Sequence, residues 1–255
     1  TQDTILVVDE AHNFGAKNLQ NTLQLDFTYR LALSATLERQ GDEDGTTVLK
    51  NFFGNKCIEY GLERAIAEKK LTPYYYYPVI VYLTDEELEK YQLYTSKIIQ
   101  NIVRRKDKTI VTNLAKEFML KLARLVAGAS EKIEKLREMA NDFKNEKNML
   151  IYCGATNVQG NDKSSDEDIR QIDYISRMLN FDFGMHTAQF TSREDSNERK
   201  RRLEEFQDGE IQALIAIKCL DEGVNVPAIK TAYILASTTN PKEYIQRRGR
   251  VLRLY

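Results

Sequence analysis

Apolar and polar positions follow two different patterns along this chain. Residues 4–8 and 29–33 are short, continuous apolar runs, the pattern of strands buried on both faces of a parallel sheet. From residue 149 onward, apolar runs alternate with stretches of helical periodicity. Strands are expected at 149–153, 184–190, 211–217 and 231–236, and helices at 168–179, at 194–206 and after Pro241. Such an alternation predicts an α/β fold with a parallel sheet.

A helical pattern fills the middle of the chain. Thr84-Asp85-Glu86-Glu87 has the form of a capping box, which predicts the start of a helix. Apolar residues then recur at helical spacing, and a second helical stretch runs from about 112 to 143, interrupted near Gly128. We expect these helices to form an arm at about residues 84–144. Basic residues at 104–108 suit a solvated turn, or alternatively a contact with a phosphate backbone.

The region ahead of the arm predicts a boundary between two domains. Residues 38–46 are polar and glycine-bearing and predict a loop, whereas 57–60 predict a strand and 62–70 a short helix. The run Tyr74–Tyr77 follows, punctuated by two prolines. These tyrosines suit a strand at the seam between domains, or alternatively the stacking of nucleobases. We therefore expect domains at 1–70 and 71–255.

Composition limits the classes of protein that fit. The 255 residues carry a net charge of -1, so a surface for nucleic acid must come from local clustering of basic residues. The three cysteines are far apart in apolar surroundings, which predicts buried free thiols in a reducing compartment. The chain shows neither a signal sequence nor an apolar run of membrane-spanning length. We expect a cytoplasmic protein that has no membrane partner.

Acidic residues follow the first apolar run. Asp9 and Glu10 stand at the carboxyl end of a predicted strand, where open α/β sheets place their ligands. This position suits a magnesium ion held through Asp9, with Glu10 orienting or deprotonating an attacking water. The alternative is that they cap the next helix. Ser34 and Thr36 follow the second run, where small hydroxyl residues commonly satisfy a turn.

Four arginines cluster near residue 250. They belong to the run Gln246-Arg247-Arg248-Gly249-Arg250-Val251-Leu252-Arg253. On a helix Arg250 and Arg253 share a face, and two guanidinium groups there suit the charge that develops on a transferring phosphoryl group. The alternative is a basic helix end that complements its own dipole.

These motifs, taken in order, resemble a known superfamily. Asp9-Glu10-Ala11-His12, Ser34-Ala35-Thr36 and the 246–253 run resemble motifs II, III and VI of superfamily 2 helicases and translocases of the DEAH-box type. The resemblance spans essentially the whole chain. It implies the tail of a first RecA-like domain, a helical arm, and a second RecA-like domain, the helicase C-terminal domain. Among these proteins, the chain looks most similar to double-stranded DNA translocases of type III restriction and DNA repair systems.

The resemblance also implies roles for single residues. Asp9 would hold Mg²⁺, Glu10 would act on water, and Arg250 and Arg253 would be arginine fingers toward ATP. His12, Ser34 and Thr36 would couple the nucleotide to movement. Nucleotide-binding or coupling roles are also implied for Gln246 and Arg247.

A further segment resembles motif V. In Lys218-Cys219-Leu220-Asp221-Glu222-Gly223, the pair Glu222-Gly223 matches the superfamily, and Asp221 or Glu222 would bind the ribose or an arginine finger. Lys218 stands where many members carry threonine. Gly154, Thr191, Ser192 and Lys218 would contact nucleic acid, although Thr191 and Ser192 equally suit a helix cap.

One motif of the superfamily does not occur in the sequence. There is no Gly-Lys-Ser or Gly-Lys-Thr, and hence no phosphate-binding P-loop. We expect a C-terminal fragment that begins at motif II, whose missing N-terminal RecA-like domain belongs to the same polypeptide. The resemblance implies an ATP-dependent motor on nucleic acid, DNA rather than RNA, partnered by nuclease or restriction subunits and inactive as this fragment alone. The alternatives are a non-catalytic RecA-like module that binds nucleic acid or protein, and another P-loop NTPase of this architecture.

Overall fold

The structure is a computed structural model of the chain. It describes residues 4–24, 27–34, 36–38, 42–105, 108–154, 166–191, 194–217 and 229–236. Within these residues one compact unit ends at Thr72 and a second begins at Pro73. No helix in the described part of the chain is long and apolar enough to cross a bilayer.

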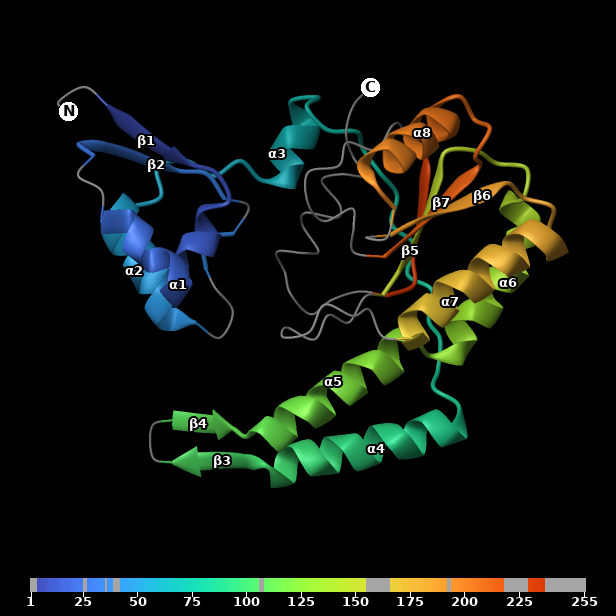
Figure 1. The fold of residues 1–255 in the computed structure, drawn as a ribbon, viewed down its shortest axis with the longest axis horizontal. Coiled ribbons are helices and arrows are strands. Elements are labelled where there is room, and N and C mark those ends of the chain that lie inside the picture. Colours follow the sequence, from blue (N-terminus) through green and yellow to red (C-terminus); the bar gives the residue numbers. More distant parts are fainter. Residues whose placement is uncertain are drawn as a thin grey trace. The chain divides into compact units, whose positions relative to one another are not determined.

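The first unit contains a pair of parallel strands and short helices (Figure 1). Its elements are β1 (Ile5–Val8), η1 (Ala11–Gly15), α1 (Lys17–Gln20), η2 (Asn21–Gln24), β2 (Tyr29–Ala32), α2 (Glu43–Phe53) and α3 (Leu62–Ala67). The two strands pair from Ile5 opposite Tyr29 to Val8 opposite Ala32. Val8 is buried, but Ile5 and Val7 are exposed, so burial of β1 on both faces was a wrong expectation.

The sequence predictions between residues 38 and 60 were partly wrong. Residues 38–46 were predicted as a loop, yet α2 begins at Glu43 because the Asp42 carboxylate accepts the Gly45 N–H at 2.9 Å. Residues 57–60 were predicted as a strand, but they form no ladder. Cys57 is exposed, contrary to the expected burial of the thiols, whereas Cys153 is buried as expected.

The second unit contains a four-stranded sheet in the order β6-β7-β5-β8, with every neighbouring pair parallel. This confirms the predicted alternation of strands and helices. The strands are β5 (Met149–Cys153), β6 (Thr187–Phe190), β7 (Ala213–Ile217) and β8 (Thr231–Ile234). The helices are α6 (Ser130–Phe143), α7 (Asp166–Arg177) with the π-helical turn η3 (Met178–Asp182), and α8 (Ser196–Gln207).

Two apolar cores cover the two faces of this sheet. Successive side chains of a strand point to opposite faces, so Met149 and Ile151 pack with Leu136 of α6 and Ile175 of α7. Leu150 and Tyr152 point the other way, and their cluster includes Phe206 of α8. The sheet is therefore the middle layer of an α/β sandwich, with α6 and α7 on one face and α8 on the other (Figure 1).

The helical arm consists of α4 (Asp85–Gln100) and α5 (Asn113–Ala127), joined by a hairpin of β3 (Ile102–Arg105) and β4 (Lys108–Val111) (Figure 1). The predicted capping box at Thr84 and Glu87 is confirmed, and Thr112 caps α5. The predicted interruption is also confirmed, since α5 ends before Gly128. The hairpin was not predicted. The Tyr94 and Phe118 rings pack between the two helices with centroids 5.9 Å apart.

An extended segment, residues 72–83, leads into the arm. It was expected to be a strand, but it forms no ladder with any strand in the described part of the chain. The Tyr75 side chain is 88% exposed, and its ring stacks on that of Tyr77 with centroids 6.4 Å apart. Aromatic residues favour strands only where a neighbouring strand or core receives them.

Candidate functional site

The carboxyl end of β1 presents two acidic residues in a tight turn. Asp9 is exposed, and its Oδ1 accepts the Glu10 N–H at 2.8 Å. Glu10 is half-buried and adopts left-handed backbone angles of φ 48° and ψ 42°. This conformation is uncommon for residues with a side chain and recurs at functional turns.

His12 links this turn to the end of β2. Its side chain is buried, with Nδ1 2.9 Å from Ser34 Oγ and 3.2 Å from Glu10 Oε2. The Ser34 hydroxyl donates its single proton to the Thr36 carbonyl at 2.7 Å. Ser34 Oγ therefore accepts from His12, which assigns the proton to Nδ1. The first two sequence motifs, far apart along the chain, thus meet through His12.

The backbone reinforces this junction. The Ala11 N–H donates to the Leu33 carbonyl at 3.0 Å, and the Leu33 N–H donates to the Val8 carbonyl at 2.8 Å. These two bonds continue the parallel ladder past the ends of β1 and β2. The segment that carries Ser34 is consequently held beside the turn that carries Asp9 and Glu10.

The donor set at this turn fits a magnesium ion only in combination with a ligand. Within the described residues, no group of three His, Cys, Asp or Glu side chains could hold a metal. Mg²⁺ is, however, commonly bound by one or two carboxylates together with phosphate oxygens and water. The exposed carboxylate of Asp9 suits that role.

In the second unit, predicted nucleic-acid contacts lie at the carboxyl edge of the sheet. Gly154 follows β5 and Thr191 follows β6, and the parallel register brings both to this edge. Gly154 is buried, and a Cβ built there would lie 2.5 Å from Ala236 Cβ and 3.1 Å from Ala127 Cβ. Packing alone therefore accounts for the glycine at position 154.

Thr191 is bound to an acidic residue three positions away. Its N–H and its hydroxyl donate to Glu194 Oε2 at 2.7 and 2.9 Å. Arg202 of α8 donates to Glu194 Oε1 at 2.9 Å and to Glu198 Oε1 at 2.6 Å. Arg199 donates to the Thr191 carbonyl at 2.8 Å. Thr191 does not cap α8, because Asp195 accepts the Asn197 and Glu198 N–H groups instead.

Most of the remaining predicted site residues lie outside the described residues. They are Ser192, Lys218, Asp221, Glu222, Gly223, Gln246, Arg247, Arg250 and Arg253. The described candidate residues therefore lie in two separate places. In the first unit they lie at the turn after β1 and the end of β2, and in the second unit at the sheet edge with Gly154 and Thr191.

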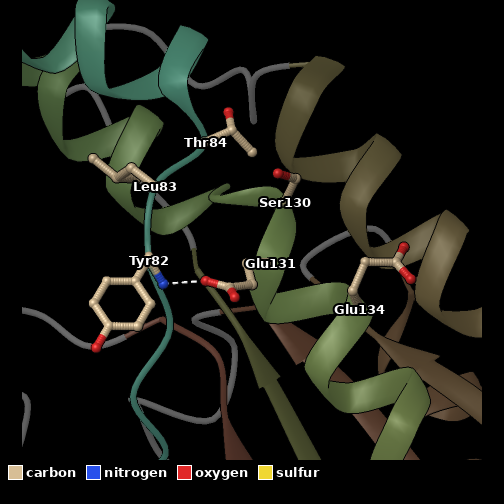
Figure 2. Close-up of a pocket in the computed structure, with 6 residues that line it drawn as sticks. All are labelled: Tyr82, Leu83, Thr84, Ser130, Glu131 and Glu134. Atoms are coloured by element: carbon tan, nitrogen blue, oxygen red, sulfur yellow. Dashed lines mark hydrogen bonds between the residues drawn. The ribbon is translucent and has the colours of Figure 1, made fainter.

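Sequence reasoning missed a polar junction at the root of the arm. A pocket of about 290 Å³ is lined by Tyr82, Leu83, Thr84, Ser130, Glu131 and Glu134 (Figure 2). Figure 2 shows the Glu131 carboxylate accepting the Tyr82 N–H at its wall. Beside it, Glu87 accepts the N–H groups of Thr84 at 3.0 Å and of Ser130 at 2.9 Å. The capping-box motif predicts only the bond between the Thr84 N–H and Glu87.

Two charged groups at this junction have shifted pKa values. Burial by itself would raise the pKa of Glu87, but the hydrogen bonds from Ser130 and Thr84 outweigh it and lower the pKa below 4.5. Burial lowers the pKa of Lys132 below 10.5, partly opposed by the negative charge of Glu87. The Lys132 ammonium donates to the Val126 carbonyl at 2.6 Å, which satisfies the last turn of α5.

Comparison with known proteins gives two sequence relatives. The chain is 27% identical over 271 residues to the DNA 3'-5' translocase XPB2 of Sulfurisphaera tokodaii, which covers 98% of this chain and 55% of the relative. The chain thus spans about half the length of that relative. Dicer-like protein 2-2 of Aspergillus niger is 35% identical over 75 residues, which covers 28% of this chain and 6% of the relative.

A solved structure and a family match complete the comparison. The helicase domain of Pyrococcus furiosus Hef resembles the chain with a TM-score of 0.49 and 16% identity, covering 96% of this chain and 68% of that one. Residues 131–255 match the family described as helicase conserved C-terminal domain. They include the parallel sheet of the second unit and the predicted motifs V and VI. Residues 131–255 therefore match a helicase C-terminal domain of superfamily 2, and their parallel sheet has an α/β fold.

Proposed function

We propose that this chain is part of an ATP-driven motor that moves along double-stranded DNA, of the type found in restriction and repair systems. The observation that carries the proposal is the contact of His12 with Ser34 beside Asp9 and Glu10. This contact joins the ends of two neighbouring strands, where a change at a nucleotide can be passed on to a second segment. The helicase C-terminal domain and the likeness to a DNA translocase also support it.

The turn after β1 would supply the hydrolytic groups. Asp9 would hold Mg²⁺, which neutralises charge on the phosphates of bound ATP. Glu10 would orient the attacking water or accept its proton. His12, held through Nδ1 beside Ser34, would sense the nucleotide and transmit its state to Ser34 and Thr36.

The second domain would complete the site. We propose domains at 1–70 and 71–255, with Arg250 and Arg253 as arginine fingers, supported by Gln246 and Arg247. Such a finger accelerates phosphoryl transfer by roughly three to five powers of ten. Asp221, Glu222 and Gly223 would bind the ribose or a finger.

The nucleic-acid contacts would come from the sheet edge of the second unit. Gly154, Thr191, Ser192 and Lys218 would face the nucleic-acid backbone. Contact with the backbone suits a motor, because its grip must not depend on base sequence. A nuclease or restriction subunit would then act on the DNA that the motor moves.

The test is ATP turnover in the presence of duplex DNA. Residues 1–255 contain no Gly-Lys-Ser or Gly-Lys-Thr, so we expect almost no turnover from them alone. A form of the protein that carries such a phosphate loop should hydrolyse ATP, and duplex DNA should stimulate it. In that form Arg250→Ala should lower turnover at least about a thousandfold. Arg201→Ala serves as a control because Arg201 pairs with Glu205 on the surface of α8.

A second candidate is a non-catalytic module that binds nucleic acid or protein, because a fold of this kind does not by itself establish chemistry. Under this alternative, the loop-bearing form would bind duplex DNA without DNA-dependent turnover. Unchanged turnover in Arg250→Ala would instead contradict the finger assignment while leaving the motor in place.

A further inference from the structure

The segment after β6 contains three donors arranged around one carboxylate. Glu194 receives a backbone N–H and a hydroxyl from Thr191 and a guanidinium N–H from Arg202, all at 2.7–2.9 Å. Its side chain is only 9% exposed. A backbone amide, a hydroxyl and an arginine are also donors that proteins use to bind phosphate oxygens. The cradle is therefore chemically suited to an anion, and Glu194 fills it.

The donors are held in place by contacts other than Glu194. Glu198 accepts from the second terminal nitrogen of Arg202 at 2.6 Å, and the Gln189 carbonyl also accepts from this guanidinium. Arg199 holds the Thr191 carbonyl from the same helix. If the Glu194 carboxylate moves away, Arg202 and Thr191 remain oriented toward the position it leaves.

The hydrogen bond from the Thr191 hydroxyl to Glu194 affects how Thr191 can bind nucleic acid. A hydroxyl has a single proton to donate, and Thr191 gives it to Glu194. In this state the hydroxyl cannot donate to a phosphate oxygen. The negative charge of Glu194 would also repel a phosphate at the same edge of the sheet.

We propose that Thr191 and Arg202 form a binding site for one backbone phosphate of nucleic acid, and that Glu194 occupies this site until the phosphate displaces it. The inference rests on the proposed function and names a site within it. Glu194 thereby lowers the affinity of the second domain for nucleic acid. Displacement of the Glu194 carboxylate by one phosphate makes Thr191 and Arg202 available for binding. The exchange keeps the number of hydrogen bonds at the three donors constant.

The test is the binding of a fluorescein-labelled DNA duplex to the full chain, measured by anisotropy over a series of salt concentrations. Glu194→Gln should tighten binding on the order of tenfold, because it removes the competing charge. The plot of log affinity against log salt should steepen by about 0.9, the value for one additional phosphate contact. If Glu194 instead serves only to stabilise the fold, Glu194→Gln should bind DNA more weakly and melt at a lower temperature.

Glu204→Gln is the matched control. Glu204 lies on α8, ten residues after Glu194, and its side chain is 62% exposed and pairs with Lys200 rather than with Thr191. It removes the same charge without touching the cradle, so affinity should change much less than in Glu194→Gln. If Glu194→Gln does not melt cooperatively, Glu194→Asp withdraws the carboxylate by one methylene and should tighten binding in the same direction.

The outcomes separate this inference from the proposed function. Tighter binding by Glu194→Gln than by Glu204→Gln supports the site, including the case where the unmodified chain binds too weakly to measure. Equal or weaker binding by Glu194→Gln, with a clear signal from the unmodified chain, overturns the site alone. No binding by any variant, even at low salt, overturns both the site and the proposed role on DNA.

Discussion

Gly154 has a role that is decided by its neighbours in space. It follows β5, and the only room for a side chain is already taken by the methyl groups of Ala236 and Ala127. Interiors are packed densely enough that one added methyl group must displace something. The residue holds two segments close together, whether or not nucleic acid approaches it.

Gly154→Ala should therefore destabilise the second unit by about 1–3 kcal/mol. Urea unfolding followed by circular dichroism measures this free energy. The double variant Gly154→Ala with Ala236→Gly should recover much of the loss, because it removes the methyl group that would lie closest. An unchanged midpoint for Gly154→Ala would show that the packing there is looser than described.

At the scale of elements, a single carboxylate fastens two helices at the root of the arm. Glu87 caps the start of α4 through Thr84 and the start of α6 through Ser130. The end of α5 is held by Lys132 of α6 and by Gln171 of α7, whose side chain donates to the Ala127 carbonyl at 3.4 Å. The start of α4 and the end of α5 are thus both bound to helices that cover the sheet.

This arrangement predicts a pH dependence of stability. The pKa of Glu87 is lower in the folded chain than its ordinary value of 4.5, so its contribution is fully present above pH 4.5 and is lost as pH falls through the folded value. Glu87→Gln should cost free energy of unfolding near pH 7 and little below the folded pKa. Urea unfolding at several pH values measures this difference.

Glu89→Gln is the control for this experiment, because Glu89 is exposed on the same helix. It should leave the pH dependence of the unmodified chain in place. A Glu87→Gln variant whose unfolding follows that of the unmodified chain at every pH would contradict the proposed double cap.

Features with a clear pattern in the local sequence were predicted correctly, and features without such a pattern were missed. The helix at Thr84 was predictable because its cap is a local contact of four residues. The sheet of the second unit was predictable because β5 and β7 are buried on both faces and carry unbroken apolar runs. The hairpin β3–β4 was missed, since each of its strands has only four residues.

The candidate site was predictable to a similar extent. Asp9, His12 and Ser34 could be found because each follows a strand in a compact motif, but the contact between His12 and Ser34 needs β1 and β2 to pair. Arg202 could not be found, because an arginine on a charged helix has the same sequence pattern whether it faces solvent or Glu194.

At the scale of the whole molecule, the chain has two units joined through the extended segment at 72–83. This segment forms no ladder with the described strands, and it exposes Tyr75 and Tyr77. Exposed, extended backbone is the preferred substrate of proteases. The segment should therefore be the most accessible position between the two units.

Brief digestion with chymotrypsin should cut first within Tyr74–Tyr77, because the enzyme cleaves after aromatic residues and these are exposed there. Mass spectrometry of the early products should find termini in this run. Tyr152, which is buried in β5, should resist cleavage under the same conditions. First cuts at Tyr152, or at Tyr94 and Phe118 of the arm, would contradict the described packing.

The fastened root gives the arm a mechanical property. Because α4 and α5 are bound at the root of the arm to helices that cover the sheet, we expect the arm to move together with the sheet, and the hairpin is the far end of the arm. The 16 residues of α4 reach about 24 Å. A rotation of the sheet by about ten degrees would carry the hairpin through about 4 Å at that radius. The arm would therefore convert a small rotation of the domain into a displacement of several ångström at the hairpin.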